Sequence, residues 1–273
     1  MALRIMNNVS ATFAQRQLGA NNAMLGKSLE RLSSGYRINH ASDDAAGLAV
    51  SEKLRFQVRG LEQAQRNIMD GISLAQVAEA GLEQTGTILQ RLRVLTLQAA
   101  NGTLANSDRL LISSEVAQLI SEIDRMQSTV TFNGIALLGS SQSIKIQVGA
   151  SPDQTISISL SGITSSSLGI DSLNDTITTS TGAMGAISTI DSALNSVLTL
   201  RSQLGASQNR MEMTYDFIGI QRENMMAAES RIRDVDFASE MTTYTKNQII
   251  VQASTAMLAQ ANVSAQSVLQ LLQ

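Results

Sequence analysis

Three residue types that often anchor a fold are missing or nearly missing from this chain of 273 residues: it has no cysteine, no tryptophan and a single proline. Without cysteine, disulfides and thiolate-bound metal ions are excluded as sources of stability. Aromatic residues make up only 3% of the chain, so a core built around large rings is not expected. The one proline, Pro152, leaves long stretches on both sides free to form uninterrupted helices.

A large excess of one charge sign is also absent, because the chain has 20 Lys and Arg, 23 Asp and Glu, and a net charge of −3. No basic block indicates nucleic-acid binding, and no polybasic amphipathic face indicates binding to anionic lipid. No apolar run approaches the ~20 residues that a membrane-spanning helix needs. The start of the sequence lacks the pattern of a cleaved secretory signal. We therefore expect no nucleic-acid partner and no membrane insertion.

Hydrophobic residues make up 43% of the chain, and 12 of them are Met. Apolar residues recur at alternating steps of four and three over residues 54–89, 112–130 and 187–232, which is the period of a coiled-coil seam. The pattern predicts long amphipathic helices, the first from about residue 43 to 100, that cover one another's apolar stripes. A few positions of these seams are polar or glycine: Gln65, Glu79, Gly86, Arg201, Gln208, Arg222 and Glu229.

Between the second and third helical stretches the hydrophobic period changes from helical to alternating. The segments "SIKIQVGA" (143–150) and "TISISL" (155–160) predict a β-hairpin with Pro152 in its loop. Residues 161–181 follow and are rich in Ser and Thr. This composition predicts an exposed polar surface loop.

Both ends of the chain repeat the three-and-four spacing, with several faces of the C-terminal segment apolar. A helix that is apolar on more than one side needs neighbours on several sides. The sequence therefore predicts that the two ends pair with each other and with copies of the same chain. The seam residues that we assign to this polymerising contact are Leu18, Leu25, Leu32, Val251, Leu258, Ala261, Val268 and Leu272.

The only histidine, His40, lies close to Asp43 and Asp44, which raises the question of a metal site or a general base. The structural interpretation is simpler. Ser42 directly precedes the long helix and suits its N-cap, while Asp43 and Asp44 suit its positive end. No second histidine and no motif of a metal-dependent or serine hydrolase accompanies them. We expect a helix start here, and no catalytic, cofactor-binding or metal-binding residues in the chain.

Two further features have a structural interpretation. The first long helix contains Gly47, Gly60, Gly71, Gly81 and Gly86, each costing up to ~1 kcal/mol relative to Ala. We expect a neighbouring segment to approach this helix closely at these positions. The stretch "RIRDVD" (231–236) could hold a carboxylate pair, but a polar hinge between two helices explains it better.

Several long segments of the chain are similar to one family. At the N-terminal side these include "SLERLSSGYRINHASDDAAGLAVSEKLR" and "EIDRMQSTVTFNG". At the C-terminal side they include "ENMMAAESRIRDVDFASEM" and "AMLAQANVSAQSVLQLLQ". Over about residues 1–150 and 184–273, the chain resembles bacterial flagellin.

The resemblance implies a mainly α fold, a long-helix coiled-coil bundle formed by both chain ends, with a small β-hairpin. It implies a terminal coiled-coil domain (often called D0) of residues 1–42 and 236–273. A second helical bundle domain with the hairpin (D1) would comprise residues 43–235. Most flagellins carry outer domains where this chain has only 161–181, so it resembles the minimal form.

The function implied by the resemblance is structural, not enzymatic. Copies of the chain would polymerise into the flagellar filament, the helical propeller for swimming. The implied partners are other copies of the chain, the flagellar type III export apparatus, an export chaperone, and the filament cap and hook-junction proteins. The implied location is outside the cell, in the extracellular flagellum.

The resemblance also implies an epitope for Toll-like receptor five. In flagellins that this receptor recognises, a helix carries a pattern of the type Q-R-x-R-x-L-x-x-Q, and this chain has "QRLRVLTLQ". Val94 departs from the family, which commonly has Glu there. The candidate epitope residues are Gln90, Arg91, Arg93, Leu95, Gln98 and Glu115.

Two alternatives to a filament subunit are considered. A hook–filament junction protein shares the terminal helices and the export route, but "AAESRIRDVDFASE" and the final "LLQ" resemble flagellin proper. An enzyme would require an inserted catalytic domain of the kind that some flagellins carry. Residues 161–181 hold no metal motif and are too few for such a domain.

Overall fold

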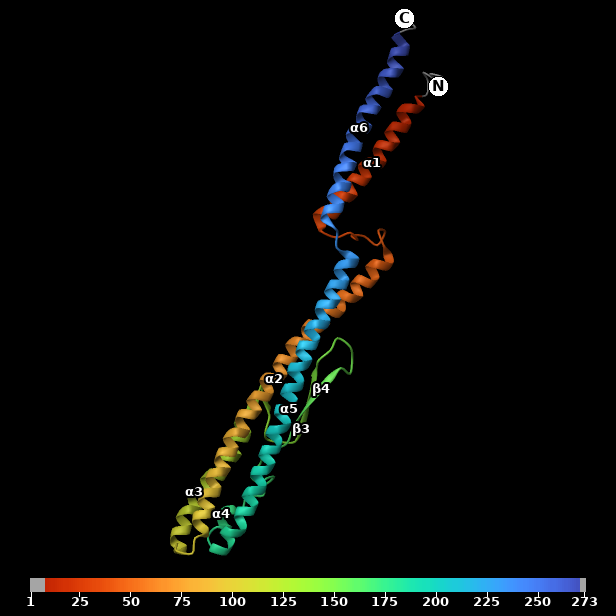
Figure 1. Cartoon of the computed structure of the whole chain (residues 1–273). Coiled ribbons are helices and arrows are strands. Elements are labelled where there is room, and N and C mark those ends of the chain that lie inside the picture. The colour runs from red at the N-terminus through yellow and green to blue at the C-terminus, as the bar shows by residue number, and fades with distance from the viewer. Residues whose placement is uncertain (1–7, 271–273) are drawn as a thin grey trace. The chain divides into compact units, whose positions relative to one another are not determined.

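The structure is a computed structural model that describes residues 8–270, with the surroundings of side chains described as far as residue 264. Helices account for most of these residues, and the few strands form two small antiparallel pairs (Figure 1). This confirms the predicted mainly α fold with a β-hairpin. In chain order the elements are α1 (Val9–Ser34), α2 (Ala45–Ala100), α3 (Asn106–Thr129), β1 (Thr131–Phe132), β2 (Ile135–Ala136), β3 (Gln142–Gln147), β4 (Thr155–Leu160), α4 (Leu173–Thr176), α5 (Ser180–Arg233) and α6 (Phe237–Gln270).

The chain forms two compact units. One, here called the central unit, comprises Gln57–Glu223. The other, the terminal unit, comprises the described residues up to Phe56 together with those from Asn224 onward. The sequence-based division into residues 1–42 with 236–273 and residues 43–235 stays a prediction.

The core of the central unit is built by α2, α3 and α5 at the predicted seam positions. Ile68, Leu82, Val116, Ile123 and Val197 are at most 1% exposed. Burial of such side chains contributes about 1.5–3 kcal/mol each. The predicted seams thus supply part of the apolar core, which also contains residues from outside them, among them Leu138 and Ile170.

Polar seam positions of α2 and α5 contact one another. Glu79 of α2 lies 3.5 Å from Arg201 Nη2 and 3.5 Å from Gln208 Nε2, both on α5. Nearer the other end of the central unit, Gln65 donates to the carbonyl of Tyr215 at 3.5 Å. At Glu79 the residue that interrupts the seam of α2 thus meets two that interrupt the seam of α5, whereas Gln65 meets a backbone carbonyl.

The β-hairpin lies along a row of glycines on α2. β3 and β4 pair antiparallel with Ile144 opposite Ile158, and Ile158 is fully buried. A Cβ atom added at Gly71 would lie 3.1 Å from Ile146 Cγ1, and one added at Gly81 would lie 2.8 Å from Leu138 Cδ1. The expected close approach is found at these two positions, but through side chains and not through a backbone. At Gly71 the nearest atom is Met211 Sδ of α5 at 3.0 Å, and the other close neighbours belong to the hairpin and the segment leading into it.

Residues 161–181 differ from their prediction as an exposed polar loop. Ile163, Ile170, Leu173 and Ile177 are at most 3% exposed, and α4 lies within this segment. The backbone N–H and hydroxyl of Ser165 donate to the Asp124 carboxylate of α3 at 3.0 and 2.8 Å. The prediction was wrong because the sparse Ile and Leu residues pack into the core while many of the Ser and Thr side chains satisfy backbone groups.

Candidate functional site

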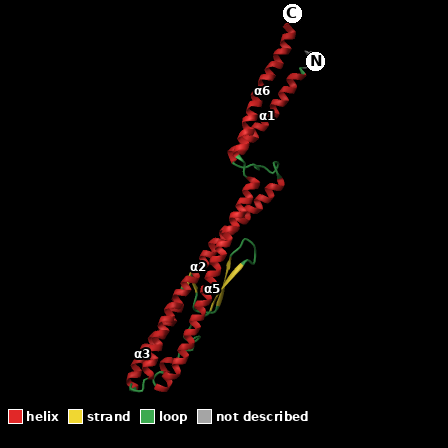
Figure 2. Cartoon of the chain, viewed as in Figure 1, coloured by secondary structure: helices red, strands yellow, loops and turns green. Residues whose placement is uncertain are grey.

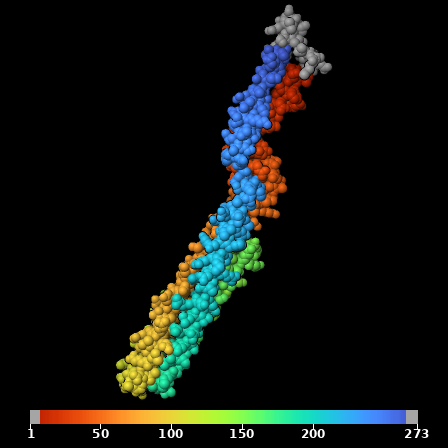
Figure 3. Space-filling model, in the orientation of Figure 1, coloured from red at the N-terminus to blue at the C-terminus, as the bar shows by residue number. Residues whose placement is uncertain are grey.

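The helices formed by the two chain ends, α1 and α6, pack against each other within the terminal unit. Asn21 Nδ2 donates to Ser254 Oγ at 2.9 Å, and Asn247 Nδ2 donates to Ser28 Oγ at 3.5 Å. Residue numbers rise along one helix as they fall along the other, so the pairing is antiparallel. In Figure 3 the surfaces of α1 (red) and α6 (blue) lie in contact.

The seam residues that were assigned to polymerisation lie in partly covered positions of this pair. Each of the described ones is half-buried, neither enclosed in a core nor freely exposed: Leu18, Leu25, Leu32, Val251, Leu258 and Ala261. The structure does not describe the side chain of Val268, and Leu272 lies outside the described residues. Assignment of these residues to contacts between copies stays a prediction.

The residues that are most enclosed in the pair are polar. Asn21 is 6% exposed, Ser28 4% and Glu240 9%, whereas the described parts of α1 and α6 contain no buried hydrophobic residue. Sequence reasoning missed these three residues because it searched the seam for apolar side chains. The three-and-four spacing does contain the signal, since Asn21 and Ser28 lie between the leucines of α1.

Large apolar side chains instead occupy the outer faces of the pair. Phe13 is 56% exposed, Ile249 60% and Met257 65%. A groove of about 620 Å³ between α1 and α6 is lined mainly by apolar residues, among them Val9, Phe13, Ile250 and Met257. Such a surface is unusual for a monomeric soluble protein and is typical of a protein interface.

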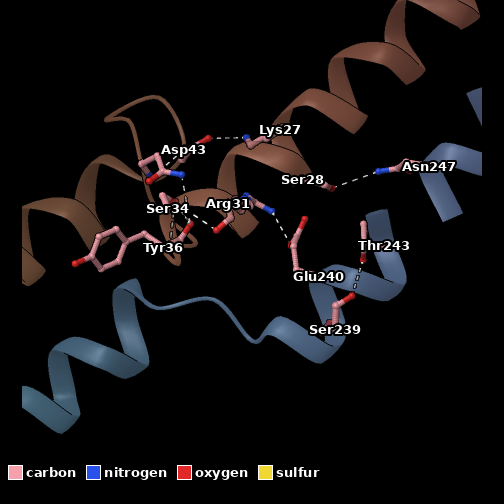
Figure 4. A network of polar contacts seen from close by, with 11 residues as sticks. Lys27, Ser28, Arg31, Ser34, Tyr36, Asp43, Ser239, Glu240, Thr243 and Asn247 are labelled. Atoms are coloured by element: carbon pink, nitrogen blue, oxygen red, sulfur yellow. Dashed lines mark hydrogen bonds and ion pairs between the residues drawn. The ribbon is translucent and has the colours of Figure 1, made fainter. Parts of the chain in front are cut away.

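Ion pairs join α1 to the segment that follows it and to the start of α6 (Figure 4). Lys27 Nζ lies 2.6 Å from Asp43 Oδ1, and Arg31 Nη1 lies 3.5 Å from Glu240 Oε2 of α6. The Lys27 hydrogen bond, assisted by the backbone N–H of His40, lowers the pKa of Asp43 to about 2. Both partners of each contact belong to the terminal unit, so the contacts order this unit locally.

Backbone contacts join the two breaks between helices within the terminal unit (Figure 2). Tyr36 and Asp234 form an isolated antiparallel bridge, and the N–H of Arg37 donates to the carbonyl of Arg233 at 2.7 Å. The Arg233 guanidinium also lies 4.8 Å from the centroid of the Tyr36 ring. α1 ends at Gly35, whose φ of 76° is a left-handed conformation that suits glycine.

The question posed by His40, Asp43 and Asp44 has a structural answer. His40 Nε2 lies 2.7 Å from Glu30 Oε1, and Asp43 binds Lys27. Asp44 accepts a hydrogen bond from the N–H of Gly47 at 2.8 Å and so caps α2, which begins at Ala45. The helix start is confirmed, but Ser42 as its N-cap was wrong, because Asp44 is the residue that directly precedes the first turn.

The hinge predicted at 231–236 is confirmed. α5 ends at Arg233 and α6 begins at Phe237. Asp236 accepts hydrogen bonds from the N–H groups of Ala238 and Ser239 at 3.0 and 3.3 Å, which is N-cap geometry.

The described residues contain no group of three or more His, Asp or Glu side chains placed to hold a metal ion. No helix among them is both long and apolar enough to span a bilayer.

The candidate receptor residues lie on α2 and α3 of the central unit. Four of them are exposed: Gln90, Arg91, Gln98 and Glu115. Arg91 Nη2 pairs with Glu115 Oε1 at 2.7 Å, and half-buried Arg93 binds Asp191 of α5 at 2.6 Å. Leu95 is only 3% exposed, so it packs into the core of the unit instead of contributing to its surface.

The chain matches two family models and many relatives. Residues 5–143 match the bacterial flagellin N-terminal helical region, and residues 187–272 match the bacterial flagellin C-terminal helical region. It is 47% identical over 283 residues to Flagellin FlaB1 of Treponema pallidum (strain Nichols), covering 98% of this chain and 99% of that protein. It is 48% identical over 282 residues to the flagellar filament 30.7 kDa core protein of Treponema maltophilum, with the same coverage of 98% and 99%.

A solved structure described as a flagellar hook-associated protein from Vibrio parahaemolyticus is similar with a TM-score of 0.60. It is 15% identical in sequence and covers 70% of this chain and 100% of that one, so the likeness concerns the fold alone. The matches to both helical regions and the nearly full-length identity to flagellins agree with the motifs and with the helix pair formed by the chain ends. This chain therefore belongs to the bacterial flagellin family.

Proposed function

We propose that this chain is a structural subunit that polymerises into the bacterial flagellar filament, and that the terminal helix pair makes essential contacts between copies. The observation that supports this role is the inverted pattern of burial in α1 and α6. Their most enclosed residues are polar, and large apolar residues such as Phe13, Ile249 and Met257 are more than half exposed. A pair of this kind gains little from folding alone and much from neighbours.

Identical chains that bury these faces against one another form contacts of the head-to-tail kind. Such heterologous contacts produce an open helical filament when the rotation between copies does not close a ring. Relatives named flagellin and flagellar filament core protein, matched along nearly their whole length, support a filament over a closed oligomer. They also favour flagellin proper over a hook–filament junction protein, the alternative that would form short assemblies.

Electron microscopy of purified protein tests the proposal. The full chain should form long hollow fibres, and a chain lacking residues 1–35 and 245–273 should form none. A finer test replaces exposed apolar residues, with Phe13→Ser and Met257→Ser expected to lower fibre yield. The control Gln260→Ala changes an exposed polar residue of α6 and should leave the yield unchanged. Long fibres from the truncated chain would contradict the proposed role of the terminal helices.

The proposed role includes the partners and location that flagellins require. The chain would leave the cell through the flagellar export apparatus, bound beforehand by an export chaperone, and would meet the cap and hook-junction proteins in the extracellular filament. No catalytic activity is part of this role. The exposed Gln90, Arg91, Gln98 and Glu115 would form the surface through which Toll-like receptor five binds.

A further inference from the structure

We propose that three polar layers in the seam between α1 and α6 are specificity determinants, which select α6 as the partner of α1 and fix one antiparallel register. The layers are Asn21 with Ser254, Ser28 with Asn247, and Arg31 with Glu240. The inference rests on the proposed function, because it concerns how a chain with many apolar faces finds the right pairing during assembly. It goes beyond that function by separating the residues that choose a partner from those that stabilise the contact.

The first two layers occupy the same seam position in successive heptads. Asn21 and Ser28 are one heptad apart on α1, and so are Asn247 and Ser254 on α6. In one layer the amide belongs to α1 and the hydroxyl to α6, and in the other layer the two are exchanged. Each layer thus brings one amide donor to one hydroxyl acceptor, and this match depends on the register.

A slip by one heptad breaks these matches in either direction. In one direction Asn21 comes opposite Ala261, which has no side-chain acceptor. In the other direction Asn21 meets Asn247, Ser28 meets Glu240, and Arg31 passes beyond the start of α6 at Phe237. In the first slip Asn21 lacks a side-chain partner. In the second the Asn–Asn and Ser–Glu pairs can still form hydrogen bonds, but the Arg31 guanidinium and the Glu240 carboxylate lose each other. A buried polar or charged group without its partner disfavours the slipped pair by about tenfold to a hundredfold. Apolar seam residues make no such distinction, since leucine packs against leucine in every heptad register.

The third layer adds charge to the match (Figure 4). Glu240 is 9% exposed, and its Oε1, like Arg31 Nε, has no further hydrogen-bond partner among the described residues. An isolated buried carboxylate is strongly unfavourable, so Glu240 depends on the Arg31 guanidinium at 3.5 Å. Because the cation is on α1 and the anion on α6, this layer favours pairing of these two helices.

A single polar residue at a core position of a coiled coil sets register and partner number at some expense of stability. The terminal pair has three such layers and no buried hydrophobic residue among its described positions. Its seam therefore provides selectivity, whereas the exposed apolar faces provide adhesion to other copies.

The register is measurable as a distance between two spin labels, because the chain has no cysteine of its own. Cysteines at the exposed positions Gln15 and Gln260 are labelled, and labelled chains are diluted among unlabelled ones so that only distances within a chain are recorded. The test variant, Asn21→Leu with Ser254→Leu, makes one layer apolar. The matched control, Asn22→Leu with Thr255→Leu, places the same residues at adjacent exposed positions.

The unmodified seam and the control should give one narrow distance. The test variant should add a second population at a longer distance, because a slip of one heptad displaces the two opposed labels by about 10 Å along the helix axis. A single unshifted distance in the test variant would overturn the inference. Filament formation is scored separately by electron microscopy. Distances are recorded in assembled filaments, where α1 and α6 are paired. An unmodified chain that forms no filaments would contradict the proposed function, whereas filaments in which the test variant keeps a single unshifted distance would overturn only the inference.

A charge exchange keeps the inference testable if the leucine variant does not fold. Arg31→Glu and Glu240→Arg each place like charges together and should lower filament yield about tenfold or more. The double variant restores opposite charges in the same layer and should recover most of the yield. If the filament yield of the double variant is no higher than that of either single variant, the inference is overturned. The layer would then depend on which helix carries each charge and not on the pairing of opposite charges.

Discussion

Gly60 of α2 lies directly beneath Ala150, next to the hairpin turn, so that a Cβ atom added at Gly60 would lie 2.7 Å from the Cβ of Ala150. At Gly86, farther along the same helix, an added Cβ would meet no atom within 4 Å. Both residues belong to the central unit and both are helical, so they form a matched pair. The missing side chain at Gly60 permits close packing against Ala150. At Gly86 it lowers the helix propensity, and no segment of this chain packs into the space.

Gly60→Ala should destabilise the central unit and Gly86→Ala should stabilise it. The first forces the hairpin away from α2, and overpacking of this kind costs about 1–3 kcal/mol. The second gains up to ~1 kcal/mol of helix propensity. Chemical unfolding followed by circular dichroism measures both changes in the free energy of unfolding. Equal effects of the same sign at the two positions would show that the hairpin is not seated on Gly60.

Arg109→Met should destabilise the turn between α2 and α3. The Arg109 side chain is 5% exposed and donates to the carbonyls of Ala99 and Asn101 at 2.8 Å each. Its removal leaves the buried carbonyl of Ala99 and the part-buried carbonyl of Asn101 without this donor, which costs about 1–3 kcal/mol. The control Arg66→Met removes an exposed i,i+4 pair with Glu62, worth about 0–1 kcal/mol. If the two variants unfold at the same denaturant concentration, this role of Arg109 is refuted.

Lys27→Met should raise the pKa of Asp43 from about 2 toward its ordinary value of 3.8, because Lys27 is the main cause of the lowered pKa. The folded-state pKa lies below the unfolded one, so ionised Asp43 favours the folded terminal unit above about pH 4. This contribution is lost as the pH falls toward 2. Solid-state NMR of the Asp43 carboxyl in assembled filaments, recorded over a series of pH values, measures the pKa, with Lys53→Met as a control for a general change of charge. An unchanged pKa in Lys27→Met would contradict the ion pair.

In the isolated chain we expect α1 and α6 to be disordered in solution and to become helical only on incorporation into a filament. Their described residues bury no hydrophobic side chain fully, so pairing alone does not offset the loss of conformational entropy. NMR of the monomer should show sharp, rapidly exchanging amides over residues 8–35 and 245–264. Core amides near Ile123 and Val197 provide the internal reference. Rigid ends in the monomer would show that folding and polymerisation are not coupled.

Receptor activation should depend on the exposed cation on α2. Arg91→Ala removes a guanidinium that lies on the surface beside Glu115, and activation of cells carrying Toll-like receptor five should fall about tenfold. Val94→Glu introduces the acidic residue common in the family and should raise activation. Arg125→Ala, which removes an exposed ion pair with Glu122 on α3, is the control. Activation unaffected by Arg91→Ala would remove this surface from consideration.

The long helices and the hairpin were predictable because both depend on local periodicity. The three-and-four spacing placed the start of α2 within two residues of Ala45, and the alternation at 155–160 reproduced β4. Gly60, Gly71 and Gly81 of α2 lie close to other segments as expected, mostly through side chains. Gly47 instead meets the Asp44 cap of the same helix and Ile38, and Gly86 meets no atom within 4 Å. Such periodic patterns are informative because they depend only on the residues of a single helix or strand.

The errors arise where long-range contacts decide the outcome. Ile163 and Ile177 are isolated among Ser and Thr, and only their packing into the core shows that 161–181 is an ordered segment. Asn21 and Ser254 are separated by 233 residues, so neither could be identified as half of a polar layer from its own surroundings. Asp44, and not Ser42, caps α2, because the helix begins at Ala45 and the Asp44 carboxylate accepts from the N–H of Gly47.

The antiparallel pairing of α1 with α6 has a consequence for biosynthesis. The first helix of the chain cannot find its partner until translation has passed Phe237. A prematurely terminated chain therefore presents a helix with nothing to lie against, however well its central unit folds. Under the proposed function, such a chain would lack the α6 face that contacts other copies in the filament.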